Sequence, residues 1–145
     1  VTISGLSFPV SDGSSGQFIK TDGSGTLSFA SAGATLSHSD LADATTTVAT
    51  STTSTLNTFD KTVYRSAKYF ISITDSTNSR FEIVEANVTH DGSDAYVSTF
   101  GSTTNYTGGL CIFTADMSGN DVRLRVTNIS DASTVFKFQR IAVDI

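Results

Sequence analysis

Short stretches in which apolar and polar residues alternate follow one another through the second half of the chain. The clearest covers residues 121–129, where Val122, Leu124 and Val126 alternate with polar residues. A period of two places every second side chain on one face, as in a strand that is buried on one side only. We therefore predict a strand here. The same reasoning predicts strands within residues 62–74, 80–90, 95–100, 110–115 and 134–145.

Two of these runs carry apolar residues on both sides of the alternation. In residues 62–74 most apolar residues share one side, but Phe70 falls on the other. In residues 80–90 the apolar positions change phase between Ile83 and Val84, which indicates a β-bulge or a strand that is covered on both faces. The apolar residues that share one side of the first run are Val63, Ala67, Tyr69, Ile71 and Ile73.

Clusters of Gly, Asn, Asp, Ser and Thr separate the runs. Short strands at this spacing, with no helical periodicity between them, are typical of antiparallel all-β domains. One further strand from residues 45–58 would complete the set. We predict an all-β fold, an antiparallel, jelly-roll-like β-sandwich of about seven to eight strands with an N-terminal β-hairpin segment. The separating clusters are residues 75–79, 90–94, 102–109, 116–121 and 130–133.

The first 33 residues contain the signature of a β-hairpin. Residues 17–21 and 26–30 flank an Asp-Gly-Ser-Gly turn, and residues 11–16 indicate a second turn one strand earlier. A small hairpin is only marginally stable in water. We therefore expect this segment to pack on the rest of the chain, on copies of itself or on a partner. The residues expected to drive assembly are Phe8, Val10, Phe18, Ile19, Leu27 and Phe29.

Residues 34–58 are polar and poor in aromatic residues, and two interpretations stay open for them. The segment is either a linker or an edge strand, with a strand expected near Val48 to Leu56. One helical turn, capped by Ser37 or Ser39, is expected in its first part. The predicted organisation is a docking hairpin in residues 1–33, the Thr-rich linker or edge strand in 34–58, and a β-sandwich domain in 59–145.

Composition and charge narrow the range of partners. Ser and Thr supply 45 of the 145 residues, and the net charge is −5. Because basic residues form no stripe or cluster, we predict no binding to nucleic acid. No apolar stretch has the length of a membrane span, so no membrane insertion is expected. The chain begins with Val1 rather than Met, which suggests a processed form or a segment of a longer protein.

Residues with catalytic or metal-binding potential are few and scattered. His38 and His90 lie far apart in the sequence, and no Gly-x-Ser-x-Gly nucleophile motif occurs. Asp-Gly pairs at Asp12, Asp22 and Asp91 could offer oxygen ligands to calcium, but their spacing favours turn formation. The lone Cys111 sits among apolar neighbours, as a buried thiol does. We therefore expect no catalytic residue, no metal and no cofactor, and a protein that is not an enzyme.

Two loops are candidates for contact with another molecule. Residues 90–94 and 102–109 are polar and rich in turn-forming residues, so they are expected to be exposed loops. Binding residues concentrate in such loops. The candidate contact residues are Tyr106, Asn105 and Asp91, with Tyr106 the strongest because a Tyr in a loop combines an apolar ring with a polar tip. Tyr96 and Phe100 lie nearby, but sheet packing is their more common role.

Four stretches of the chain together resemble a β-rich module of virion structural proteins from tailed marine bacteriophages, especially T4-like phages of cyanobacteria. Residues 8–31 resemble a short repeat of phage fibre and fibre-like proteins, in which a Gly-Gln-x-x-x-x-Asp-Gly turn is followed by a Leu-Ser-Phe strand. The four stretches read "YRSAKYFISITD" (64–75), "EIVEANVTHDGSDAYVSTFG" (82–101), "FTADMSGNDVRLRVTN" (113–128) and "STVFKFQRI" (133–141).

The resemblance implies a non-enzymatic component of the phage particle surface, either a fibre-like appendage or a protein that decorates the capsid or tail. It also implies a homotrimer that contacts other virion proteins. A Gly- and Ser-rich hairpin with few apolar groups is consistent with this, because several chains can share one core around an axis. The alternative is a receptor-binding module whose loops recognise a host surface glycan or protein.

Overall fold

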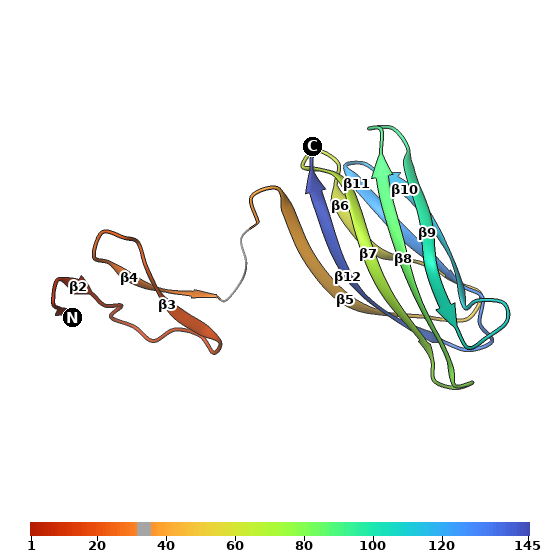
Figure 1. The fold of residues 1–145 in the computed structure, drawn as a ribbon, viewed down its shortest axis with the longest axis horizontal. Helices are drawn as coiled ribbons and strands as arrows, with labels where there is room; N and C mark the ends of the chain where they lie inside the picture. The colour runs from red at the N-terminus through yellow and green to blue at the C-terminus, as the bar shows by residue number, and fades with distance from the viewer. Residues whose placement is uncertain (32–35) are drawn as a thin grey trace. The chain divides into compact units, whose positions relative to one another are not determined.

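The computed structural model describes residues 1–31 and 36–145, which fall into two compact units. The first unit is Val1–Leu36 and the second is Ser37–Ile145 (Figure 1). The boundary predicted between residues 33 and 34 lies outside the described residues.

The first unit contains the predicted hairpin. Strands β3 (Gln17–Thr21) and β4 (Leu27–Ser31) pair antiparallel, and the short strands β1 (Thr2–Ile3) and β2 (Leu6–Ser7) form a second small pair. In the β3–β4 turn the Asp22 carboxylate accepts hydrogen bonds from the backbone N–H groups of Ser24 (2.7 Å) and Thr26 (3.0 Å). The flanking glycines have φ values of 79° and 94°, a region that L side chains rarely adopt. The hairpin prediction is confirmed.

No described residue of the first unit is buried. In the β3–β4 register Ile19 lies opposite Phe29, whereas Phe18 lies on the other face of the hairpin. The Phe29 ring packs on Gly13, where an added Cβ would come within 2.7 Å of the ring. Phe8 and Val10, which were expected to drive assembly, lie outside the strands, and Val10 is 95% exposed.

The second unit contains eight strands in two antiparallel sheets (Figure 1). A five-stranded sheet has the order β5-β12-β7-β8-β9, and a three-stranded sheet has the order β10-β11-β6. The strands are β5 (Ser39–Val48), β6 (Thr53–Asp60), β7 (Tyr64–Asp75), β8 (Arg80–His90), β9 (Ala95–Thr104), β10 (Cys111–Ser118), β11 (Asp121–Asn128) and β12 (Thr134–Asp144).

One hydrophobic core receives side chains from both sheets. The alternation predicted for residues 121–129 is confirmed, because the apolar residues of β11 are fully buried. The all-β, antiparallel class is therefore confirmed, while the jelly-roll-like arrangement stays a prediction. The largest fully buried apolar side chains are Tyr69, Phe136, Ile71, Ile73, Leu110 and Leu124.

Within residues 1–31 and 36–145, no helix has the length and apolar character needed to cross a membrane.

The Thr-rich segment differs from its prediction. The expected helical turn is wrong, because β5 begins at Ser39 and pairs with β12 along its whole length, from Ser39 opposite Val143 to Val48 opposite Thr134. This pairing partner lies almost a hundred residues away, so the short-range capping signal does not decide the structure. The strand expected near Val48 to Leu56 is interrupted by a turn before β6. Strands β5 and β6 are both edge strands, and β6 runs through the boundary predicted between residues 58 and 59.

The change of phase in residues 80–90 corresponds to a strand with apolar residues on both faces, because Phe81 and Ile83 face away from the core while Val84 is buried. The register of β8 against β9 shifts between Ile83 and Glu85. Against β7, with which β8 pairs in unbroken register, Glu82 lies opposite the buried Ile73 and Glu85 lies opposite the exposed Phe70. The two carboxylates therefore point to opposite faces of the sheet.

Candidate interaction surfaces

The side of the five-stranded sheet that faces away from the core is built from aligned rows of side chains. We call this surface the outer face and define it by three such rows. Each row crosses all five strands, because the register places one residue of each strand in line. The rows are Leu41, Ile141, Lys68, Asn87 and Ser98; Asp43, Gln139, Phe70, Glu85 and Phe100; and Ser39, Val143, Ser66, Thr89 and Tyr96.

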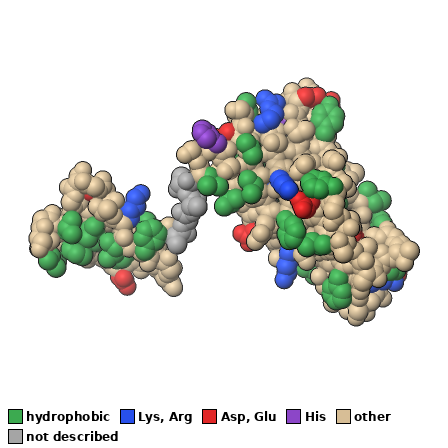
Figure 2. All heavy atoms as spheres, in the orientation of Figure 1, with side chains coloured by type: hydrophobic (Ala, Val, Ile, Leu, Met, Phe, Trp, Pro, Cys, Tyr) green, Lys and Arg blue, Asp and Glu red, His purple; other side chains and the backbone are tan. Residues whose placement is uncertain are grey.

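Large apolar side chains of the outer face stand in water. Each of six has between 40% and 54% of its surface exposed. Figure 2 shows hydrophobic side chains gathered around charged ones on the visible side of the second unit. Contiguous apolar surface of this kind marks interaction sites more often than isolated exposed residues do. The six are Leu41, Phe70, Tyr96, Phe100, Ile141 and Val143.

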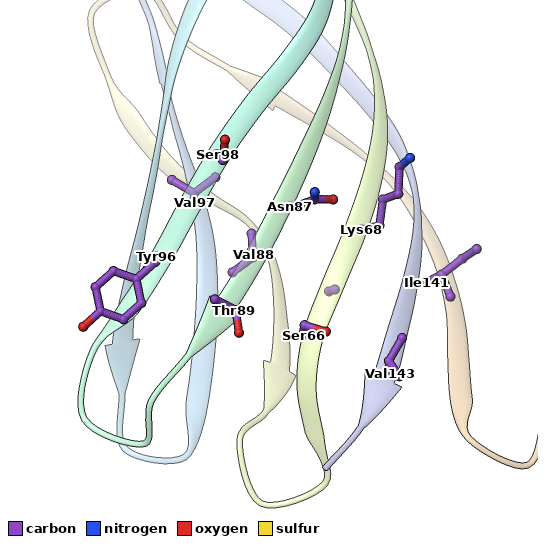
Figure 3. A pocket seen from close by; sticks show the side chains of 11 residues that line it. Ser66, Lys68, Asn87, Val88, Thr89, Tyr96, Val97, Ser98, Ile141 and Val143 are labelled. Carbon is purple, nitrogen blue, oxygen red and sulfur yellow. The ribbon is translucent and has the colours of Figure 1, made fainter.

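Two neighbouring grooves lie on the outer face. The larger, of about 630 Å³, is bordered by Tyr96 on one side and by Ile141 and Val143 on the other (Figure 3). Polar side chains, among them Asn87, occupy the space between these borders. The smaller groove, of about 440 Å³, is lined by Leu41, Ile141 and other residues of β5, β7 and β12. Both grooves are open, so they suit contact with the surface of another macromolecule better than enclosure of a small ligand.

The charged groups of the outer face are close to balanced. The Lys68 ammonium is 2.6 Å from the Glu85 carboxylate and 5.4 Å from the centre of the Phe100 ring. Asp43 and Lys137 lie close to this pair in the strand register, and both line a further groove on the same sheet. The three rows hold one base and two acids, and Lys137 in the adjacent row adds a second base, so this side of the sheet carries no strong field of either sign.

The outward side of the three-stranded sheet has a different character. Asp116 accepts two hydrogen bonds from Arg123, at 2.7 and 2.8 Å, and a third from Arg125 at 3.2 Å. The hydrogen bonds from Arg123 lower the pKa of the Asp116 carboxyl below its usual value, with a smaller contribution from Arg125. Thr53 and Thr127 are hydrogen-bonded at 2.7 Å. Apart from Ile112, this side is polar, and both of its arginines are paired with Asp116.

The three residues predicted to contact a receptor lie at opposite ends of the five-stranded sheet. Asp91 follows β8 and accepts hydrogen bonds from its own turn, from the backbone N–H groups of Ser93 and Asp94, and from the Tyr96 hydroxyl, all at 2.8 Å. The backbone bonds lower the pKa of Asp91 to about 2. Asn105 follows the far end of β9, so the structure does not bring it to Asp91.

Asn105 and Tyr106 stand beside the β7–β8 turn. The Asn105 side chain accepts a hydrogen bond from the Phe81 backbone N–H (2.8 Å) and donates one to the Ser79 carbonyl (3.0 Å). The Arg80 guanidinium lies 3.9 Å from the centre of the Tyr106 ring. The Asn105 hydrogen bonds therefore hold the loop in place, and the Tyr106 ring and the Arg80 cation lie side by side. Their contact role stays a prediction.

The histidines and the cysteine are not gathered into one site. His90 is buried and its Nε2 lies 2.9 Å from the Tyr64 carbonyl, while His38 precedes β5. Burial and the nearby Glu82 carboxylate raise the pKa of the half-buried Cys111 thiol far above its usual value, which favours an unreactive thiol. Among residues 1–31 and 36–145, no group of three or more His, Cys, Asp or Glu side chains is placed to hold a metal ion.

The apolar part of the outer face was missed by sequence reasoning. The alternation assigned one side of each strand to the core and left the other side without a role. The signal was present, since Phe70 falls on the polar side of its run and Ile141 and Val143 do so in theirs. Apolar residues on both sides of a strand indicate that both sides are covered.

Comparison with known proteins gives matches among solved structures alone. No protein-family model matches the chain, and no curated protein sequence matches it. Three of the matched structures are phage tailspike proteins.

Three matches illustrate the likeness. The tailspike protein of Acinetobacter baumannii phage AM24 is 11% identical with a TM-score of 0.47, and the match covers 74% of this chain and 26% of the tailspike. The tailspike protein gp49 of Acinetobacter baumannii bacteriophage Fri1 is 16% identical with a TM-score of 0.37, and the match covers 73% of this chain and 18% of the tailspike. The tailspike protein of Acinetobacter phage vB_ApiP_P1 is 17% identical with a TM-score of 0.39, and the match covers 77% of this chain and 22% of the tailspike. The chain thus spans about a quarter or less of each tailspike protein.

One of these comparisons corrects the expectation that the protein is not an enzyme. The Fri1 tailspike protein is described as a capsular polysaccharide depolymerase. The prediction that the protein is not an enzyme is therefore withdrawn.

Proposed function

We propose that this chain is a building block of a phage tail appendage, which assembles with further copies through its first unit and with other virion proteins on the particle surface. The observation that carries the proposal is that residues 1–31 form a regular hairpin in which no residue is buried. A homotrimer and an origin in T4-like phages of cyanobacteria, both implied by the sequence resemblance, are part of the proposal, as is the sandwich arrangement of the second unit.

The physical support for assembly is the exposed apolar surface of the hairpin. Phe18 and Ile19 are each about half exposed, on opposite faces, and Val10 is almost fully exposed. Completing the burial of such a side chain contributes about 1 kcal/mol or more. A single chain cannot cover both faces of a two-stranded hairpin with the few apolar groups of this unit. Several copies around one axis can do so, because each copy then covers its neighbour.

Limited proteolysis combined with light scattering tests the proposal. We expect the full chain to be oligomeric at micromolar concentration, with residues 1–31 protected from protease. The double variant Phe18→Ser/Ile19→Ser should expose this segment and increase its cleavage rate at least tenfold. Lys20→Ser, on the same strand, is the control and should leave the protection unchanged. Protection of residues 1–31 in a chain that light scattering shows to be monomeric would refute the proposal.

A second candidate function is recognition of a host surface glycan or protein. The observation that favours it is the pair formed by the Tyr106 ring and the Arg80 guanidinium at 3.9 Å, held beside a loop that Asn105 fixes. An aromatic ring with an adjacent cation suits a polar ligand with an apolar ring face.

This candidate predicts that Tyr106→Ala abolishes binding on a glycan array, whereas Tyr106→Phe, which keeps the ring, retains most of it. The fold is expected to survive both changes because Tyr106 lies in an exposed loop. Equal binding by the native chain and Tyr106→Ala would show that this loop is not the contact.

A further inference from the structure

The two outward sides of the second unit differ in a way that indicates a covered surface. On the three-stranded side the charged groups are paired with one another and the surface is polar. On the five-stranded side six large apolar side chains stand about half exposed, aligned in adjacent rows. A folded protein in water rarely leaves contiguous apolar surface of several hundred Å² uncovered. The contrast indicates that the outer face meets a partner.

We propose that the partner is a second copy of this chain, bound through the same outer face. Taking about 200 Å² for a fully exposed large side chain, the six apolar residues offer on the order of 500 Å² of apolar surface. The polar members of the three rows surround them and add further area. Together they approach the roughly 800 Å² that each partner contributes to a standard protein interface. The outer face is therefore large enough to hold two copies together.

The charge pattern favours a copy of the chain over a partner of strong charge. Lys68 and Lys137 share this side of the sheet with Asp43 and Glu85. A surface of one sign repels its own copy, whereas a balanced surface can place an acid of one copy against a base of the other. The aliphatic members, Leu41, Ile141 and Val143, form no hydrogen bonds, so they suit another apolar protein surface better than a hydroxyl-rich sugar.

This inference extends the proposed function. When copies assemble through the first unit, their second units are tethered to one another. Tethering raises the effective concentration of the outer faces to the millimolar range for short connections. A weak intrinsic affinity between faces is then sufficient to hold them together. The two contacts reinforce each other without either being required for the other to form.

Introducing a charge at Phe70 tests the proposal in the full-length chain. Phe70 lies on the middle strand of the sheet and is 49% exposed, so Phe70→Lys and Phe70→Glu should both fold, which thermal unfolding checks. We expect each variant alone to raise the dissociation constant of self-association at least tenfold in sedimentation velocity. An equimolar mixture of the two should regain association, because opposite charges then meet across the interface. Thr114→Lys, on the polar three-stranded side, is the matched control and should associate like the native chain.

Three outcomes would overturn the inference. The first is unchanged self-association of the Phe70 variants. The second is a mixture that fails to associate when each variant alone has lost association. The third is loss of binding to a bacterial polysaccharide with association unchanged, which would assign the outer face to a saccharide. Failure of the first-unit proposal is recognised separately, by protease protection of residues 1–31 in a monomer, and leaves these results intact.

Discussion

Arg140→Ala is expected to lower the free energy of unfolding of the second unit by about 3 kcal/mol. Arg140 is 5% exposed and lies on β12, with its guanidinium inside the unit. It donates hydrogen bonds to the Asn57 side-chain oxygen (3.0 Å) and the Thr58 carbonyl (2.9 Å), both on β6, and forms an ion pair with Asp40 on β5. One side chain thus connects the two sheets.

The size of this effect follows from what the substitution leaves behind. Without the guanidinium, the part-buried Thr58 carbonyl loses a donor and the Asn57 oxygen loses one of its two donors. A buried group left without a partner costs about 1–3 kcal/mol. Asp40 is partly exposed and can be hydrated, which keeps the loss at the lower end of the range for a broken buried pair. Asn57 retains one donor, the Tyr69 hydroxyl at 3.0 Å, which burial keeps un-ionised by raising the pKa of Tyr69 well above its usual value.

Urea denaturation followed by circular dichroism measures this change. Lys137→Ala, three residues earlier on the same strand but exposed, is the matched control and should change the unfolding free energy by less than about 0.5 kcal/mol. If the two variants have equal stability, the buried connection between the sheets does not contribute as described.

The strand pattern of the second unit could be predicted from the sequence because it depends on local alternation. Val122, Leu124 and Val126 are buried as expected, and the phase change near Ile83 marks a strand with apolar residues on both faces. The Asp22 turn was predictable for the same reason, since its hydrogen bonds join residues within four positions of one another.

The parts that were not predicted depend on residues far apart in the chain. Strand β5 exists because β12 pairs with it, and nothing within residues 34–58 encodes that partner. Arg140 falls on the core side of an otherwise apolar alternation, and its acceptor Asn57 lies 83 residues away. Asp91 and Asn105 were correctly placed in turns, but their side chains are engaged by backbone groups, which single-sequence reasoning does not reveal.

The outer face illustrates the same limit for function. The sequence showed that Phe70 lies opposite the core, yet only the register brings Phe70, Ile141 and Phe100 onto one surface. These residues come from three strands that are separated by up to seventy positions. A single exposed Phe needs no explanation, whereas several aligned ones indicate an interaction surface.

Phe136→Ala is expected to have the largest effect on the stability of the second unit, a loss of about 3–5 kcal/mol. The Phe136 ring is fully buried on β12, next to the buried Ile73 of β7 in the sheet register. Removing it forfeits the burial of the ring and leaves a cavity between the two sheets, which close packing on both sides prevents from collapsing. Since a domain of this size is stable by only about 5–15 kcal/mol, the variant should lie near the threshold of unfolding.

Thermal unfolding provides the measurement, with an expected fall in the midpoint of more than about 10 °C. Phe81→Ala is the matched control, because Phe81 is the same residue type on β8 but 52% exposed, and its loss should cost less than about 1 kcal/mol. The difference between the two phenylalanines separates the contribution of the shared core from that of exposed apolar surface. Similar midpoints for the two variants would mean that the two sheets do not enclose one packed core at this position.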